Sequence, residues 1–123
     1  MLTIDILKEY GANVEEGLTR CLNNEDFYLR LVGIALGDGN FARLENAVAA
    51  EDVKEAFEAA HALKGALGNL SLTPLFDPAS RLTEVLRGAA SFDEGLHGTK
   101  EEAVAYAAEI RDQKARLDAL AAE

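Results

Sequence analysis

Tryptophan is absent from this sequence, and cysteine, methionine and proline are scarce. The 123 residues contain one Cys, one Met and two Pro, and aromatic residues make up only 7% of them. Cys21 cannot form a disulfide within the chain, so we expect a reducing compartment. Its helical spacing with Val14, Leu18 and Leu22 predicts a packed core thiol rather than a reactive one.

Basic residues and long apolar runs are also lacking. The chain has 12 Lys and Arg against 22 Asp and Glu, which gives a net charge of −10. Such an acidic surface repels nucleic acids and anionic membranes, so we expect neither as a partner. No apolar run approaches the roughly 20 residues that span a bilayer. The first residues, MLTIDILKEYG, lack the features of a signal peptide. We therefore expect a cytoplasmic protein.

The residues that are present favour helices. Hydrophobic residues make up 49% of the chain, and Ala and Leu dominate them, which predicts an all-α fold. A chain of this length is expected to form a single domain, residues 1–123. Capping residues and glycines delimit expected helices at residues 4–10, from Asn13 onward, and at 25–36, 41–50, 53–70, 74–87 and 99–121. They predict an antiparallel up-down four-helix bundle from about residue 52 to 121, with additional short N-terminal helices within 1–50.

The beginnings of two of these helices need particular residues. Asp52 is expected to cap the helix at 53–70, with a glutamate at the position that completes a capping box. Thr73 is expected to cap the next helix, with Pro74 as the first helical residue. Pro78 leaves two alternatives, because the helix either bends there or begins at Asp77.

The helix at 53–70 carries the most informative pattern. Its apolar stripe consists of Val53, Ala56, Ala60, Leu63, Leu67 and Leu70. His61 lies off this stripe, and the outward face around it carries Lys54, Phe57, Glu58, Lys64, Gly65 and Gly68. Because glycine in a helix costs about 1 kcal/mol relative to alanine, two glycines beside His61 suggest that another molecule closely approaches the backbone there. Phe57 offers that molecule an apolar contact, and Lys64 offers a charge to any anion that the histidine carries.

Simpler explanations compete with a docking site. A lone histidine on a helix is commonly a residue without a special function, and glycines also permit close packing between helices. The position of His61 away from the apolar stripe favours the docking site over both. His97, in the segment LHGTK, shows no pattern of partner residues and is assigned no role.

The segment AHALKG around His61 resembles the His-x-x-Lys-Gly pattern of the histidine-phosphotransfer (HPt) domain of bacterial phosphorelays. Further points of resemblance are Asp52, Asn69, Leu75 and the segment EYGANVEEGLTRCLNNEDFYLRLV. Two positions depart from the family pattern. Ser71 stands where the family often has glycine, and Glu84 falls one place later than the usual glutamate.

The resemblance implies a phosphorelay intermediate. His61 would be the phosphoacceptor, taking a phosphoryl group on Nε2 from a receiver-domain aspartate and passing it to another receiver. Lys64 would screen the phosphoryl oxygens, and Gly65 and Gly68 would admit the loops of the receiver. The implied partners are response-regulator receiver domains and a hybrid histidine kinase. This chain would be a monomer without a cofactor, since the receiver would hold the Mg²⁺.

The sequence offers no site for autonomous kinase activity. A Walker A motif is absent, and GDGNFA does not match even the G-x-G-x-x-G pattern. We therefore expect a protein that is not an enzyme in its own right and that needs a phosphoryl donor.

Two other classes of function stay open. An adaptor of the same fold would bind receivers or a kinase without being phosphorylated. A metal- or haem-binding bundle is disfavoured, because no His or Cys follows His61 at three or four residues. The joint presence of His61, Lys64 and Gly65 favours the phosphorelay intermediate over both.

Overall fold

The computed structural model describes residues 1–92 and 99–122, and these residues form seven helices and no strand. The helices are α1 (Ile4–Tyr10), α2 (Val14–Arg20), α3 (Glu25–Leu36), α4 (Asn40–Ala49), α5 (Val53–Asn69), α6 (Thr73–Leu86) and α7 (Thr99–Ala122). The all-α prediction is confirmed, and the predicted helix boundaries agree to within one residue, apart from the alternative start at Asp77.

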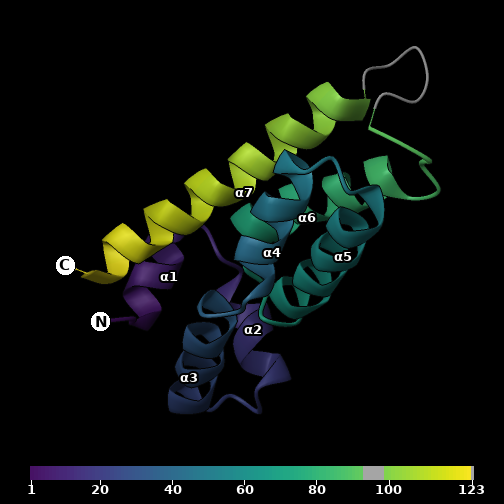
Figure 1. Cartoon of the computed structure of the whole chain (residues 1–123). Coiled ribbons are helices and arrows are strands. Elements are labelled where there is room, and N and C mark those ends of the chain that lie inside the picture. Colours follow the sequence, from purple (N-terminus) through teal and green to yellow (C-terminus); the bar gives the residue numbers. More distant parts are fainter. Residues whose placement is uncertain (93–98, 123) are drawn as a thin grey trace.

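Helices α4 to α7 form the predicted antiparallel up-down bundle (Figure 1). α5 packs against α4 and α6, and α7 packs against α6 and α4, which completes the bundle. The bundle therefore begins at α4, whereas the predicted grouping began it near residue 52 and left α4 among the N-terminal helices. α4 belongs to the bundle because Leu44 and Ala47 on its apolar face are buried in the core.

α5 packs between α4 and α6. Four residues of its predicted stripe are fully buried: Ala56, Ala60, Leu63 and Leu67. Val53 is only half-buried, because it lies in the first turn. Ala59 is buried in addition, since α4 and α6 together cover a wider face than one stripe. The remaining face, which carries His61, is exposed.

Four helices begin at a side-chain cap, and the predicted Asp52 cap is one of them. Side chains that accept a hydrogen bond from the first turn of α1, α2, α3 and α5 belong to Thr3, Asn13, Asn24 and Asp52. α6 differs, because its N-cap is Leu72, which has no side-chain cap, and Thr73 is the first helical residue. The predicted Thr73 cap is therefore wrong. α6 also begins before Pro78 and continues through it, and Pro78 and the adjacent Ala79 are both buried.

Cys21 is a free thiol that is 3% exposed, as predicted. Leu22, expected beside it in the core, is instead 88% exposed. α2 ends at Arg20, and Leu22 has a left-handed φ of 57°. The helical spacing on which the expectation rested therefore ends before Leu22.

α2 and α3 are fastened to the turn between α5 and α6. The Tyr28 hydroxyl of α3 donates a buried 2.8 Å hydrogen bond to the Leu70 carbonyl. Burial raises the pKa of Tyr28 to about 12, so this donor keeps its proton at physiological pH. The Tyr28 ring lies so close to α2 that a Cβ on Gly17 would be 2.6 Å from it. The backbone N–H of Asn13 donates a further 2.9 Å hydrogen bond to the backbone carbonyl of Ser71.

Ser71 adopts a strained backbone in this turn. Its φ of 56° is left-handed, a conformation that glycine adopts without a steric penalty. This geometry explains why glycine suits the position in the family that the sequence resembles. The Ser71 hydroxyl is buried and has no hydrogen-bond partner among the described residues. The turn holds a strained residue because the bonds from Asn13 and Tyr28 fix it on both sides.

Replacing Tyr28 with Phe should lower the free energy of unfolding by about 1–3 kcal/mol, because the Leu70 carbonyl is buried and loses its donor. Urea unfolding followed by circular dichroism measures the change. Tyr106→Phe is the matched control, since the Tyr106 hydroxyl makes no hydrogen bond within the described part of the chain. It should change the free energy by less than about 0.5 kcal/mol. Equal effects of the two substitutions would contradict the role given to the Tyr28 hydroxyl.

Candidate functional site

His61 lies on the exposed face of α5 and makes no hydrogen bond or ion pair with the described residues. Its ring stacks on Phe57, one turn earlier on the same helix. The two ring centroids are 5.6 Å apart, and the ring planes are inclined by 26°. The imidazole is thus stacked on one side, and its nitrogens have no hydrogen-bond partner among the described residues.

Phe57 also joins His61 to a cation from the next helix. The guanidinium carbon of Arg87, at the C-terminal end of α6, lies 5.4 Å from the centre of the Phe57 ring, within the range of a cation–π contact. Sequence reasoning missed Arg87, because a helical wheel of α5 contains no information about the end of α6. The only signal was a basic residue at the predicted end of that helix.

Lys64 lies one turn after His61 and reaches toward α6. Its Nζ is 3.8 Å from Oε1 of Glu84, and Nη2 of Arg87 is 3.1 Å from the same oxygen. Hydrogen bonding to Arg87, and more weakly the charge of Lys64, keep the pKa of the Glu84 carboxyl below its ordinary value. Glu84 therefore stays ionised and shares its charge between the two cations.

The two glycines of α5 have different surroundings. A Cβ built on Gly65 would meet no heavy atom within 4 Å, so this position is open, as the sequence predicted. A Cβ on Gly68 would lie 2.9 Å from Cε1 of Phe76 on α6. Gly68 therefore lets the Phe76 ring pack closely on α5, and the expectation that both glycines leave open space is wrong for Gly68.

A groove with a volume of about 530 Å³ runs from His61 along α5 to α2. Lys64 and Gly65 line it beside the histidine, Phe76 forms part of the α6 wall, and Arg20 of α2 lies at the far end. Arg20 donates a hydrogen bond to the Gly68 carbonyl near the end of α5. The groove thus has walls from α2, α5 and α6, although His61 and Lys64 both lie on α5.

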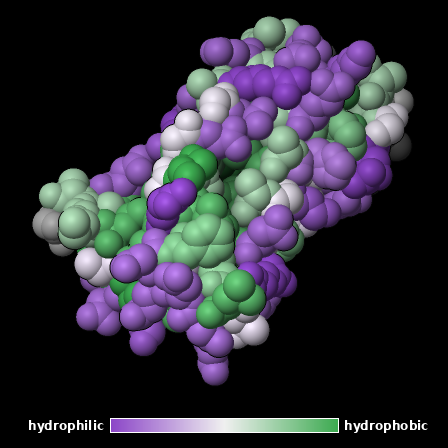
Figure 2. Space-filling view, turned by 90° about the horizontal axis from the view of Figure 1, so that it is seen from below, coloured by the Kyte–Doolittle hydropathy of each residue, from purple (hydrophilic) through white to green (hydrophobic). Residues whose placement is uncertain are grey.

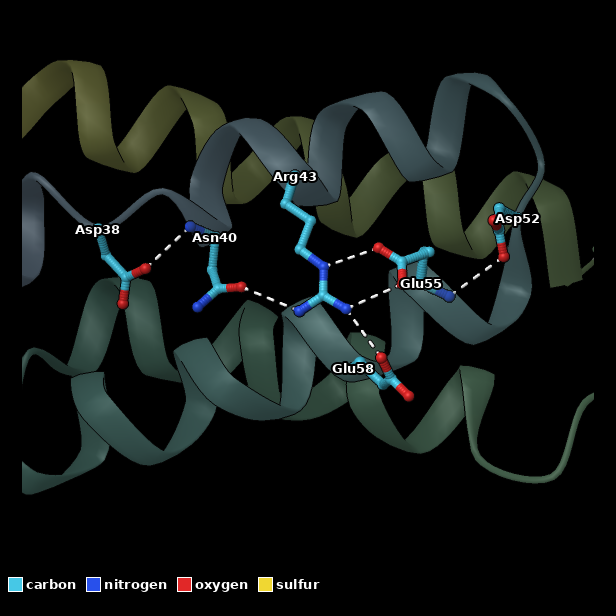
Figure 3. Close-up of polar contacts among 6 residues, drawn as sticks. All are labelled: Asp38, Asn40, Arg43, Asp52, Glu55 and Glu58. Carbon is cyan, nitrogen blue, oxygen red and sulfur yellow. Dashed lines mark hydrogen bonds and ion pairs between the residues drawn. The ribbon is translucent and has the colours of Figure 1, made fainter.

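Glu58 and Lys54, the other residues predicted to dock a partner, lie on the N-terminal half of α5. Arg43 of α4 reaches both Glu55 and Glu58 (Figure 3). Its nitrogens lie 2.8 Å from an oxygen of each carboxylate. Glu58 therefore helps to hold α4 on α5, while 45% of its side chain stays exposed. Lys54 is exposed about two turns before His61. A docking role for either residue stays a prediction.

An apolar surface between α3 and α5 adjoins the groove. Phe27 and Ile34 of α3 are 42% and 63% exposed. A second hollow is lined by Ile34 together with Leu31 of α3 and Ala66 of α5, and it shares Asn69 with the groove at His61. The face seen from below, on the side of α3, carries hydrophobic residues between hydrophilic borders (Figure 2).

A family model of the Hpt domain matches residues 36–123, which include α4 to α7 and His61. The protein therefore belongs to the Hpt domain family. Members of this family serve histidine phosphotransfer in phosphorelays, as carriers rather than enzymes, and interact with receiver domains and kinases. The match begins at the end of α3, so it does not include the resemblance predicted for residues 9–32. Searches of curated proteins and of solved structures gave no match.

None of the described helices combines the length and the apolar character needed to cross a bilayer. Within the described ranges, 1–92 and 99–122, no three histidine, cysteine or carboxylate side chains are grouped so that they could hold a metal ion. His97 lies outside the described residues.

The different surroundings of the two glycines predict opposite effects of the same substitution. Gly65→Ala should raise the free energy of unfolding by up to about 1 kcal/mol, because alanine favours the helix and meets no neighbour. Gly68→Ala should lack this gain or lower stability, because the Phe76 ring must move. Thermal and urea unfolding of the two variants test the difference. If both substitutions stabilise the protein equally, Gly68 is not needed for packing.

Proposed function

We propose that this protein is a phosphorelay carrier in which His61 accepts a phosphoryl group from the aspartyl phosphate of one receiver domain and passes it to another. The observation that carries this proposal is the placement of an exposed histidine beside Lys64 and the open Gly65, in a chain of the Hpt family. The partners on this proposal are response-regulator receivers and a hybrid histidine kinase.

The chemistry asks little of this chain beyond a positioned imidazole. The lone pair of Nε2 on His61 attacks the phosphorus of the acyl phosphate while the ring proton remains on Nδ1. The N–P bond forms as the P–O bond to the receiver's aspartate breaks, and that carboxylate leaves with the electron pair. Passage to a second receiver is the reverse step on a new aspartate. On this proposal Mg²⁺ belongs to the receiver, and this chain needs no cofactor.

The surroundings of His61 suit such a transfer, which depends mainly on positioning and charge neutralisation. Stacking on Phe57 orients the ring. Gly65, with no neighbour within 4 Å of a Cβ, leaves room for the loops of a receiver. Lys64 lies on the same side of the helix as His61 and can approach the phosphoryl oxygens.

His61→Gln should abolish phosphate uptake, because the amide has no nucleophilic ring nitrogen. The measurement is incubation with a receiver phosphorylated by acetyl phosphate, followed by an assay for acid-labile phosphate. The free energy of unfolding should change by less than about 0.5 kcal/mol, since His61 is exposed.

His97→Gln is the matched control, because it removes the only other histidine of the chain. It should take up phosphate at the wild-type rate. Uptake retained by His61→Gln would contradict the assignment, and its loss in His97→Gln would point to His97 instead. A wild-type protein that binds the receiver and takes up no phosphate would be an adaptor instead.

Lys64→Ala should slow phosphoryl transfer by severalfold to about a hundredfold without unfolding the bundle, because the phosphoryl group loses a nearby cation. Lys64→Arg should restore part of the rate. Single-turnover transfer at two salt concentrations measures the effect, which should shrink at high salt. Equal rates for Lys64→Ala and the wild type at both concentrations would show that Lys64 has no part in transfer.

A further inference from the structure

We infer that Glu84 is a positioning residue that competes with the phosphoryl group for Lys64 and Arg87, and so limits how far the transfer equilibrium favours phosphohistidine. The inference rests on the proposed function, since it concerns the same site. It assigns a role to an acidic residue that lies on α6, outside the helix that carries the histidine.

The geometry places one carboxylate, Glu84, in ion pairs with both Lys64 and Arg87. Glu84 holds Arg87 closely, with Nη2 at 3.1 Å and Nε at 3.2 Å from its oxygens. It holds Lys64 more loosely, at 3.8 Å, which is long for an ion pair. Lys64 can therefore leave Glu84 more easily than Arg87 can.

Lys64 and Arg87 are each related to His61 in space, Lys64 through the shared helix and Arg87 through the Phe57 ring. Lys64 is one turn away on the same helix face. Arg87 contacts the ring of Phe57, which stacks on the imidazole. A phosphoryl group on His61 would thus form at the edge of an existing cluster of one anion and two cations.

The charges of this cluster change sign on phosphorylation. Lys64 and Arg87 against Glu84 give a net charge of about +1, and a phosphoryl group adds about −2. The phosphoryl group and Glu84 must then share two cations. Each contact that Lys64 makes with the phosphoryl oxygens weakens its pairing with Glu84, so the carboxylate opposes accumulation of phosphohistidine.

The nearby acidic residues of α5 do not compete in the same way. Glu55 and Glu58 both pair with Arg43 of α4, at 2.8 Å to each carboxylate. Their charges are therefore offset by a cation that comes from the other side of α5. Glu84 is the described carboxylate that pairs with Lys64.

The test is the equilibrium of phosphoryl exchange between a purified receiver and the full chain. Glu84→Gln should shift this equilibrium toward phosphohistidine by about twofold to fivefold, the range expected from one exposed ion pair. Glu9→Gln removes the same charge from α1, which packs on α7, and should leave the equilibrium unchanged because that charge is remote and screened. In a Lys64→Ala background, the shift caused by Glu84→Gln should become smaller.

The outcomes separate the inference from the proposed function. A wild-type protein that takes up no phosphate overturns both. A wild-type protein that is phosphorylated, with Glu84→Gln at the same equilibrium or shifted toward the aspartyl phosphate, overturns only the inference. If Glu9→Gln shifted the exchange equilibrium by the same amount, the effect of Glu84→Gln would come from net charge alone. That result would also overturn the role of Glu84. Circular dichroism of each variant checks that the bundle is intact.

Discussion

The site depends on one constraint: α5 must pack against helices on two sides while the face that carries His61 stays exposed to solvent. Small residues make this possible, because three fully buried alanines allow α4 and α6 to approach closely: Ala56, Ala59 and Ala60. Arg43 then fixes α4 along the first half of α5. His61 is consequently carried by a rigid helix rather than a loop, which suits a reaction governed by positioning.

The sequence predicted most of what is local to one helix, with the Thr73 cap and the burial of Leu22 as the exceptions. Caps such as Asp52, the helix ends and the outward position of His61 all follow from spacing within a single segment. What it could not predict are contacts between helices. Phe76 against Gly68, Arg87 over Phe57 and the place of α4 in the bundle depend on how separate segments meet in space, which no periodicity encodes.

The residues that line the groove at His61 extend beyond the part of the chain that matches the Hpt family. Arg20 of α2 forms part of its far wall and contacts the last turn of α5, yet it precedes the matched residues 36–123. Tyr28 and Asn13 hold these N-terminal helices in place. The family match therefore accounts for the bundle and the histidine, while the shape of the groove also depends on α2.

A phosphoryl carrier must release its cargo as readily as it accepts it, and this requirement gives the charges around His61 a common logic. In a chain with a net charge of −10, a bare histidine face would repel a phosphoryl group. Lys64 and Arg87 offset that repulsion locally. Two unopposed cations, however, would hold the phosphoryl group and favour only acceptance. A carboxylate such as Glu84, already paired with both, keeps them at the site while weakening their hold on the phosphoryl group, and so brings acceptance and release closer to balance.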